Sequence, residues 1–177
     1  MDEHIEEEED IAEERAEEAA RFGAVIAKRP IHSLTTLKDP ICVAPSATVL
    51  RAVEVMNEGR VGCVLIVDGE KLVGIFTERD VLRKVVGLGR DAATTPVGEV
   101  MTPDPECLTL GDGIGYALNR MCDGGFRRIP LVDADGHPTG VVTMRNIVDA
   151  IVDQISNDVR NLPPLPTLET PREREGA

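Results

Sequence analysis

The sequence predicts an α+β protein in which two β-α-β-β-α repeats pack together as one pseudo-twofold module. A strand-to-helix junction occurs twice, as GIFTERDVL at residues 74–82 and as GVVTMRNIV at residues 140–148. The residues before the two junctions follow the same order of apolar runs and turn residues, which indicates a tandem duplication. A repeat of about 50 residues is too small to bury a sheet and two helices alone, so we expect both repeats to share one core.

The first repeat is expected over residues 31–92, and its first elements are an extended segment and a helix. The segment DPICV at residues 39–43 precedes Ser46, which is placed to cap a helix of regularly spaced apolar residues. Gly59 is placed to end this helix.

Two strands and a second helix follow in the first repeat. The uncharged run at residues 61–67 predicts a buried strand, Asp68-Gly69 a tight turn, and residues 71–76 a second strand. A helix is expected to begin at Thr77. Its apolar residues, which we expect to be buried, are Val81, Leu82, Val85 and Val86.

The second repeat, expected over residues 95–157, keeps the same order of elements. Asp104-Pro105 corresponds to Asp39-Pro40, and the last strand again runs into a threonine, Thr143. The expected final helix carries the apolar residues Ile147, Val148, Ile151, Val152 and Ile155. The two repeats therefore differ more in side chains than in layout.

The two ends of the chain differ in composition from the repeats. Residues 1–22 hold eleven acidic residues against two arginines, a balance of −9 out of the chain's −13. Residues 1–29 are predicted to form an acidic arm, with a frayed helix, a partner-binding arm and a solvated tail as the alternatives. Residues 158–177, rich in proline and charge, are predicted to be a disordered tail.

Composition excludes several classes of function. Aromatic residues make up 2% of the chain and no basic stripe is visible, which argues against nucleic-acid binding. The sequence shows neither a signal peptide nor an apolar run long enough to span a bilayer, so we expect a cytoplasmic protein with no membrane contact. The four cysteines lack metal-site spacing and are expected to be small buried thiols.

The duplicated unit resembles the CBS domain, and the pair of units resembles a Bateman module. The resemblance covers roughly residues 31–157 and is carried by the junctions Gly74–Asp80 and Gly140–Asn146, by Met56 and Met121, and by RRIPLVD at residues 127–133. It implies a regulatory module that binds an adenine nucleotide (AMP, ADP or ATP) or S-adenosylmethionine between the repeats. It also implies a homodimer.

Within this resemblance, Thr77 and Asp80 are the candidate ligand contacts of the first repeat. A carboxylate accepts both hydroxyls of a ribose, and the free N–H groups at a helix start suit a phosphate. The family uses these two positions in that way. The alternative is that Thr77 and Asp80 only cap the helix, because Thr-x-x-Asp is also a capping box.

The second repeat departs from the pattern, because Asn146 replaces the aspartate. Asn146 keeps a carbonyl acceptor, but loss of the charge should weaken ribose binding at the site formed with Thr143, or should let this site tolerate a phosphate better. Candidate phosphate contacts are Arg79, Arg127, Arg128 and Arg145, with surface cations as the alternative for Arg79 and Arg145. The resemblance further implies base or cleft contacts at Ile41, Glu106 and Pro130. We therefore predict two unequal clefts.

No catalytic residues are predicted. The three histidines are far apart in the sequence, and no Ser/His/Asp order, phosphate-binding loop or metal-ligand spacing is present. The prediction is a stand-alone regulatory module, not an enzyme, that binds a small nucleotide and signals to a separate protein target. The alternatives are a structural or oligomerisation module with no bound ligand and, less favoured, an enzyme that uses the cleft.

Overall fold

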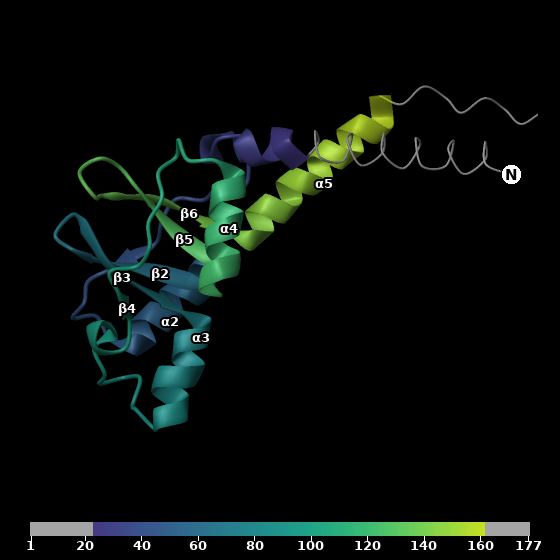
Figure 1. The fold of residues 1–177 in the computed structure, drawn as a ribbon. Helices are drawn as coiled ribbons and strands as arrows, with labels where there is room; N and C mark the ends of the chain where they lie inside the picture. Colours follow the sequence, from purple (N-terminus) through teal and green to yellow (C-terminus); the bar gives the residue numbers. More distant parts are fainter. Residues whose placement is uncertain (1–22, 162–177) are drawn as a thin grey trace, which may run out of the picture.

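The computed structural model describes residues 23–161, and its first repeat is built on a four-stranded sheet (Figure 1). The strand order is β1-β2-β3-β4, with β1 parallel to β2 and the other pairs antiparallel. The four strands are β1 (Cys42–Val43), β2 (Cys63–Asp68), β3 (Lys71–Thr77) and β4 (Thr102–Pro103). The helix α2 (Val49–Gly59) connects β1 to β2 and packs through Val49, Ala52 and Met56.

The helix that follows β3 changes its type along its length. It begins as α3 (Glu78–Asp80), widens into a π-helical turn η2 (Val81–Val85), and ends as the 3-10 turn η3 (Val86–Leu88). Gly89 ends the helix with a φ of 63°, a conformation that glycine adopts without strain.

The second repeat has the same order of elements. Leu108 forms a parallel bridge with Leu131, which is the counterpart of the β1–β2 pairing. The remaining elements are α4 (Ile114–Gly124), β5 (Arg128–Val132), β6 (Pro138–Thr143) and α5 (Met144–Asn161). The β-α-β-β-α order in both repeats confirms the predicted α+β fold class.

The segment that leads into each repeat packs against the other repeat. The 3-10 turns η1 (Ile31–Ser33) and η4 (Val97–Glu99) stand at equivalent places, after Pro30 and Pro96. Pro30 bridges Gly113 at the start of α4, whereas Pro96 bridges Thr48 at the start of α2. The repeats thus exchange their leading segments, which the sequence comparison missed because it began at Asp39 and Asp104.

This exchange divides the core into two clusters. Ile31 and Leu34 are buried among second-repeat residues that include Ile129 and Ile147. Val97 and Val100 are buried among first-repeat residues such as Phe76. A third, smaller cluster joins the two sheets and contains Cys63, Leu65, Ile75, Leu72 and Val141. Neither repeat has a complete core without the leading segment of the other.

Several local predictions were wrong. Thr48, not Ser46, caps α2: its hydroxyl accepts a hydrogen bond from the backbone N–H of Arg51 at 3.2 Å. The predicted end of α2 at Gly59 is confirmed, and the left-handed conformation that follows it is carried by Arg60. Of the cysteines, only Cys63 is buried, and burial raises the pKa of its thiol to about 11.

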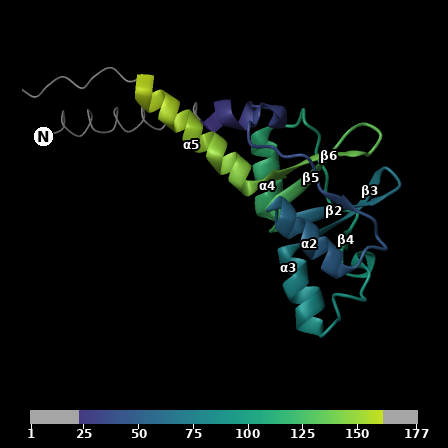
Figure 2. The ribbon, with the colours of Figure 1, turned by 180° about the vertical axis from the view of Figure 1, so that it is seen from behind.

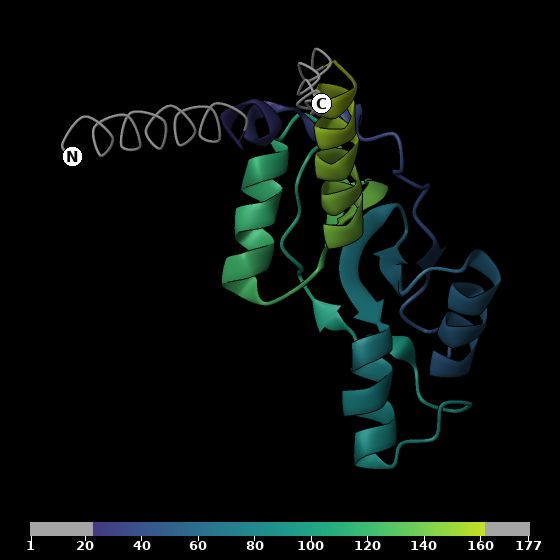
Figure 3. The ribbon, with the colours of Figure 1, turned by 90° about the vertical axis from the view of Figure 1, so that its right-hand side faces the viewer.

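The last helices of the two repeats expose residues that helical periodicity had placed in the core. Leu82 and Val86 are 66% and 67% exposed, and their counterparts Val148 and Val152 on α5 are 48% and 54% exposed. Ile155 is also exposed. Figures 2 and 3 show α3 with its continuing turns and α5 extending in opposite directions from the strands.

The helix α5 extends to Asn161, so its last turn lies within the segment predicted to be a disordered tail. Most of the predicted acidic arm (residues 1–22) and the rest of the tail (residues 162–177) lie outside the described residues. Within residues 23–161, none of the helices combines the length and the apolar character that crossing a bilayer requires.

Candidate functional site

The first strand-to-helix junction forms a closed capping box. Asp80 Oδ2 accepts hydrogen bonds from the backbone N–H of Thr77 at 2.9 Å and from its hydroxyl at 2.7 Å. The backbone N–H of Asp80 donates to Thr77 Oγ1 at 3.3 Å. Asp80 is 9% exposed, so its carboxylate is held almost buried at the start of the helix. Capping and ligand binding are thus compatible, because the cap uses only one carboxylate oxygen.

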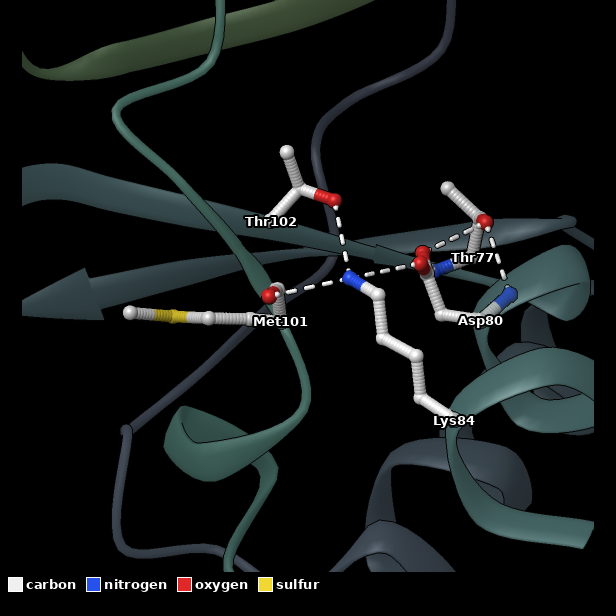
Figure 4. A network of polar contacts seen from close by, with 5 residues as sticks. All are labelled: Thr77, Asp80, Lys84, Met101 and Thr102. Atoms are coloured by element: carbon white, nitrogen blue, oxygen red, sulfur yellow. Dashed lines mark hydrogen bonds and ion pairs between the residues drawn. The ribbon is translucent and has the colours of Figure 1, made fainter. Parts of the chain in front are cut away.

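The other oxygen of Asp80 is paired with Lys84. Lys84 Nζ lies 2.9 Å from Asp80 Oδ1 and also donates to the carbonyl oxygen of Met101 at 3.1 Å and to Thr102 Oγ1 at 3.2 Å. Figure 4 shows the ammonium group between the carboxylate and the chain at residues 101–102. The helix of the first repeat is therefore tied to the segment that leads into the second repeat.

The second junction repeats the cap with an amide. Asn146, also 9% exposed, accepts at Oδ1 from the backbone N–H of Thr143 at 2.8 Å and from its hydroxyl at 2.5 Å. Its Nδ2 donates to the carbonyl oxygen of Thr36 at 3.0 Å and to Thr36 Oγ1 at 2.8 Å. The structure thus places Thr77, Asp80, Thr143 and Asn146 in matching positions.

Both junctions are tethered to a leading segment, but by different chemistry. Thr36 ends the segment PIHSLTT, and Thr102 ends PVGEVMT, so the two threonines are equivalent. Asn146 reaches Thr36 directly, whereas Asp80 reaches Thr102 only through Lys84. A cavity of about 200 Å³ opens beside Asn146, between residues 29–36 and α5. The two junctions differ in charge, because Asp80 stands where the other has Asn146, and they also differ in tether, which the sequence did not predict.

Two of the candidate arginines join the repeats. Arg128 pairs with Glu78 at 3.3 Å, and Arg79 Nη1 donates to the carbonyl oxygen of Gly125, after α4, at 3.2 Å. Arg128 passes close over Gly62, where an added Cβ would lie 2.0 Å from its Nη2. Both arginines lie beside the first junction, and each contacts a residue of the other repeat.

The remaining candidates are more scattered. Arg145 has an 89% exposed side chain and lies 3.9 Å from Asp149 on its own helix. Arg127 is exposed, and Pro130 is buried in β5. The carbonyl oxygen of Ile41 already accepts from the backbone N–H of Leu65 at 2.9 Å.

Glu106 is held by an ion pair. Its carboxylate contacts Arg120 on α4 through both oxygens, with Nη2 to Oε2 at 2.8 Å. These hydrogen bonds keep the pKa of Glu106 below its usual value. The pair fastens the start of the second repeat to α4.

Acid should therefore remove the contribution of Glu106 to stability. A carboxyl whose pKa is lowered in the folded state stabilises it above the ordinary pKa, about 4.3 for Glu, and ceases to do so as pH falls through the lowered value. We expect Glu106→Gln to reduce the free energy of unfolding at neutral pH and to have no effect once the carboxyl is protonated in the folded state. Urea denaturation at neutral pH and at an acid pH that protonates Glu106 tests this prediction. The control is Glu54→Gln, a change at an exposed glutamate. A loss that persists unchanged in acid would contradict it.

Sequence reasoning missed three contributors to the site: Lys84, Thr36 and the Met101–Thr102 segment. Lys84 lies four residues after Asp80, a spacing that permits a helical ion pair. The recurrence of threonine at the ends of PIHSLTT and PVGEVMT was also visible. Their convergence on the junctions depends on the exchange of leading segments.

Comparison with known proteins agrees with this architecture. The model of the CBS domain family matches residues 32–87 and 97–153. The CBS domain-containing protein CBSCBSPB3 of Arabidopsis thaliana is 39% identical over 115 residues, which cover 65% of this chain and 21% of that protein. This chain spans between 16% and 24% of the length of the first three curated relatives it matches.

Solved structures share the fold over most of the described residues. An uncharacterized conserved protein from Pyrococcus horikoshii is 27% identical with a TM-score of 0.64, covering 70% of this chain and 92% of that one. CBSX2, solved in complex with AMP, is 28% identical with a TM-score of 0.59, covering 70% and 96% of the two chains. The resemblance carried by the two junctions is confirmed, and the chain belongs to the CBS domain family, with two copies of the domain packed as a pair.

Proposed function

We propose that this protein is a regulatory module that binds an adenine nucleotide or a related adenosyl ligand between its CBS repeats and signals to a partner protein. The observation that carries the proposal is the nearly buried carboxylate of Asp80 at a helix start, with Asn146 as its counterpart. Asp80 would accept the ribose hydroxyls, and the N–H groups of the same helix start suit a phosphate. The AMP bound by CBSX2 supports this ligand class.

Signalling would use the contacts that join the repeats. Arg79 and Arg128 stand beside the first junction and hold groups of the other repeat. A phosphate competes for both cations, because charge-assisted hydrogen bonds to phosphate are strong. Binding would then favour the arrangement of repeats that suits the ligand, and the change in population is the signal.

We further propose that two modules associate as a homodimer. The exposed apolar residues Leu82 and Val86 on one helix and Val148 and Val152 on the other occupy equivalent positions. Exposed apolar side chains that repeat along one side of a helix suit an interaction site. The two faces suit a symmetric contact with a second copy of the chain.

Calorimetric titration with AMP, ATP and S-adenosylmethionine tests the proposed function. We expect at least one of these to bind at sub-millimolar concentration, and sedimentation velocity on the same samples to give the mass of a dimer. If none of them binds in that range, the proposed regulatory function is wrong, and the protein is instead a structural or oligomerisation module.

A further inference from the structure

We propose that Lys84 is an affinity- and specificity-determining residue of the first cleft, because it occupies the carboxylate oxygen that a ribose needs. This inference rests on the proposed function, since it concerns the same carboxylate. A ligand that donates both of its ribose hydroxyls to Asp80 must displace the ammonium group, because the other contacts leave room for one donor only. The first cleft is thus closed by a latch that consists of Lys84, Asp80, Met101 and Thr102 (Figure 4).

The contacts at the junction leave a single acceptor place on Asp80, which is too few for the two hydroxyls of a ribose. Oδ2 accepts two hydrogen bonds from Thr77, and Oδ1 is paired with Lys84 at 2.9 Å. The ammonium group has three protons and three acceptors within 3.2 Å, so its donor capacity is filled as well. The side chains of Asp80 and Lys84 are 12% and 36% exposed, so solvent screens this pair less than an ordinary surface pair.

The second repeat shows what the junction looks like without such a latch. The position equivalent to Lys84 is Ala150, which offers no cation. Asn146 makes the tether to Thr36 with its Nδ2 and keeps Oδ1 for the cap. The cavity beside Asn146 lies at this junction, between α5 and the segment that leads into the first repeat. The ion pair is therefore specific to the repeat that has the carboxylate.

The helix itself is irregular at this point. The π-helical turn η2 begins directly after Asp80 and contains Lys84. Such turns are rare and are often found at functional sites. When the ammonium group leaves Asp80, its hold on Met101 and Thr102 is also free to change, which links occupancy of the first cleft to the segment leading into the second repeat.

The test compares Lys84→Met with Arg83→Met in the full chain. Arg83 is exposed on the same helix and makes none of the latch contacts. Its replacement therefore removes one positive charge, as Lys84→Met does, but leaves the latch intact. Adenosine is the main probe, because it has no phosphate that a lost cation could affect. We expect calorimetry to give a gain in adenosine affinity of about fivefold for Lys84→Met and no gain for Arg83→Met.

Two further probes separate the latch from other roles of Lys84. The gain should be smaller for 2′-deoxyadenosine, which offers one hydroxyl fewer; an equal gain would mean that Lys84 merely fills space and would overturn the proposal. If Lys84→Met weakens AMP binding and leaves adenosine binding unchanged, Lys84 donates hydrogen bonds to the phosphate. That result would also overturn the proposal.

Amide hydrogen exchange without ligand gives an independent readout. Exchange at Met101 and Thr102 should become faster in Lys84→Met and stay unchanged in Arg83→Met. Unchanged exchange in both variants would overturn the latch even if ligands bind. Faster exchange with no binding of any probe to any variant would instead retain the tether and remove the proposed function.

Discussion

Asp80→Ala is expected to weaken AMP binding by about tenfold to a hundredfold, and by more than Asn146→Ala does. A hydrogen bond to a charged group contributes about 1.5–3 kcal/mol, and the ribose can donate twice to the carboxylate. Asn146 has no charge, and its Nδ2 is committed to Thr36. Calorimetric titration of the two variants and the wild type measures the difference.

The control for this experiment comes from the second repeat. Asp80 also closes the capping box, so its removal affects the helix as well as the ligand. Asn146 makes the same bonds to Thr143, so Asp80→Asn should retain the cap and remove only the charge. Equal or reversed effects of the Asp80 and Asn146 variants would show that the stronger ribose site is assigned to the wrong repeat.

Ile31→Ala is expected to reduce the free energy of unfolding by about 2–5 kcal/mol, the usual range for a fully buried aliphatic side chain. Ile31 is 0% exposed and packs in the cluster formed by the second repeat, although it stands at the start of the first repeat in the chain. This loss would be a large share of the total free energy of unfolding, which is about 5–15 kcal/mol for an ordinary domain. Urea denaturation followed by circular dichroism measures it.

Val25→Ala provides the comparison, because Val25 lies shortly before the leading segment and its side chain is 58% exposed. Its effect should stay within about 0.5 kcal/mol. Hydrogen exchange in Ile31→Ala should rise more in β5 and β6 than in β2 and β3. If the two variants lose equal stability, the leading segment does not complete the second core.

Much of the fold could be predicted because the signals are local and occur twice. The apolar run ending at Val67 and the Asp68-Gly69 turn predict β2 and the start of β3 within one or two residues, since a buried strand next to a tight turn has a distinctive pattern. Helical periodicity was less informative for Leu82 and Val86. A spacing of apolar residues shows which side of a helix is apolar, and does not show whether the same chain covers that side.

The candidate site divides in the same way. Thr77, Asp80, Thr143 and Asn146 were identifiable because their spacing in sequence creates their geometry: each cap closes within one helical turn. The partner of Arg79 lies 46 residues away, and that of Arg128 lies 50 residues away. Contacts of this kind depend on how the two sheets meet, for which one sequence has no local signal.

The strand-to-helix junction at residues 74–82 illustrates both sides of this division. The amino-acid order alone determined the duplication, the cap at Thr77 and the difference in charge between Asp80 and Asn146. The exchange of leading segments and the place of Lys84 followed only from packing, because Met101 and Thr102 come within reach of Lys84 where β4 pairs with β3. A lysine side chain is long and flexible, and the acceptors that the fold brings within its reach decide which group it holds.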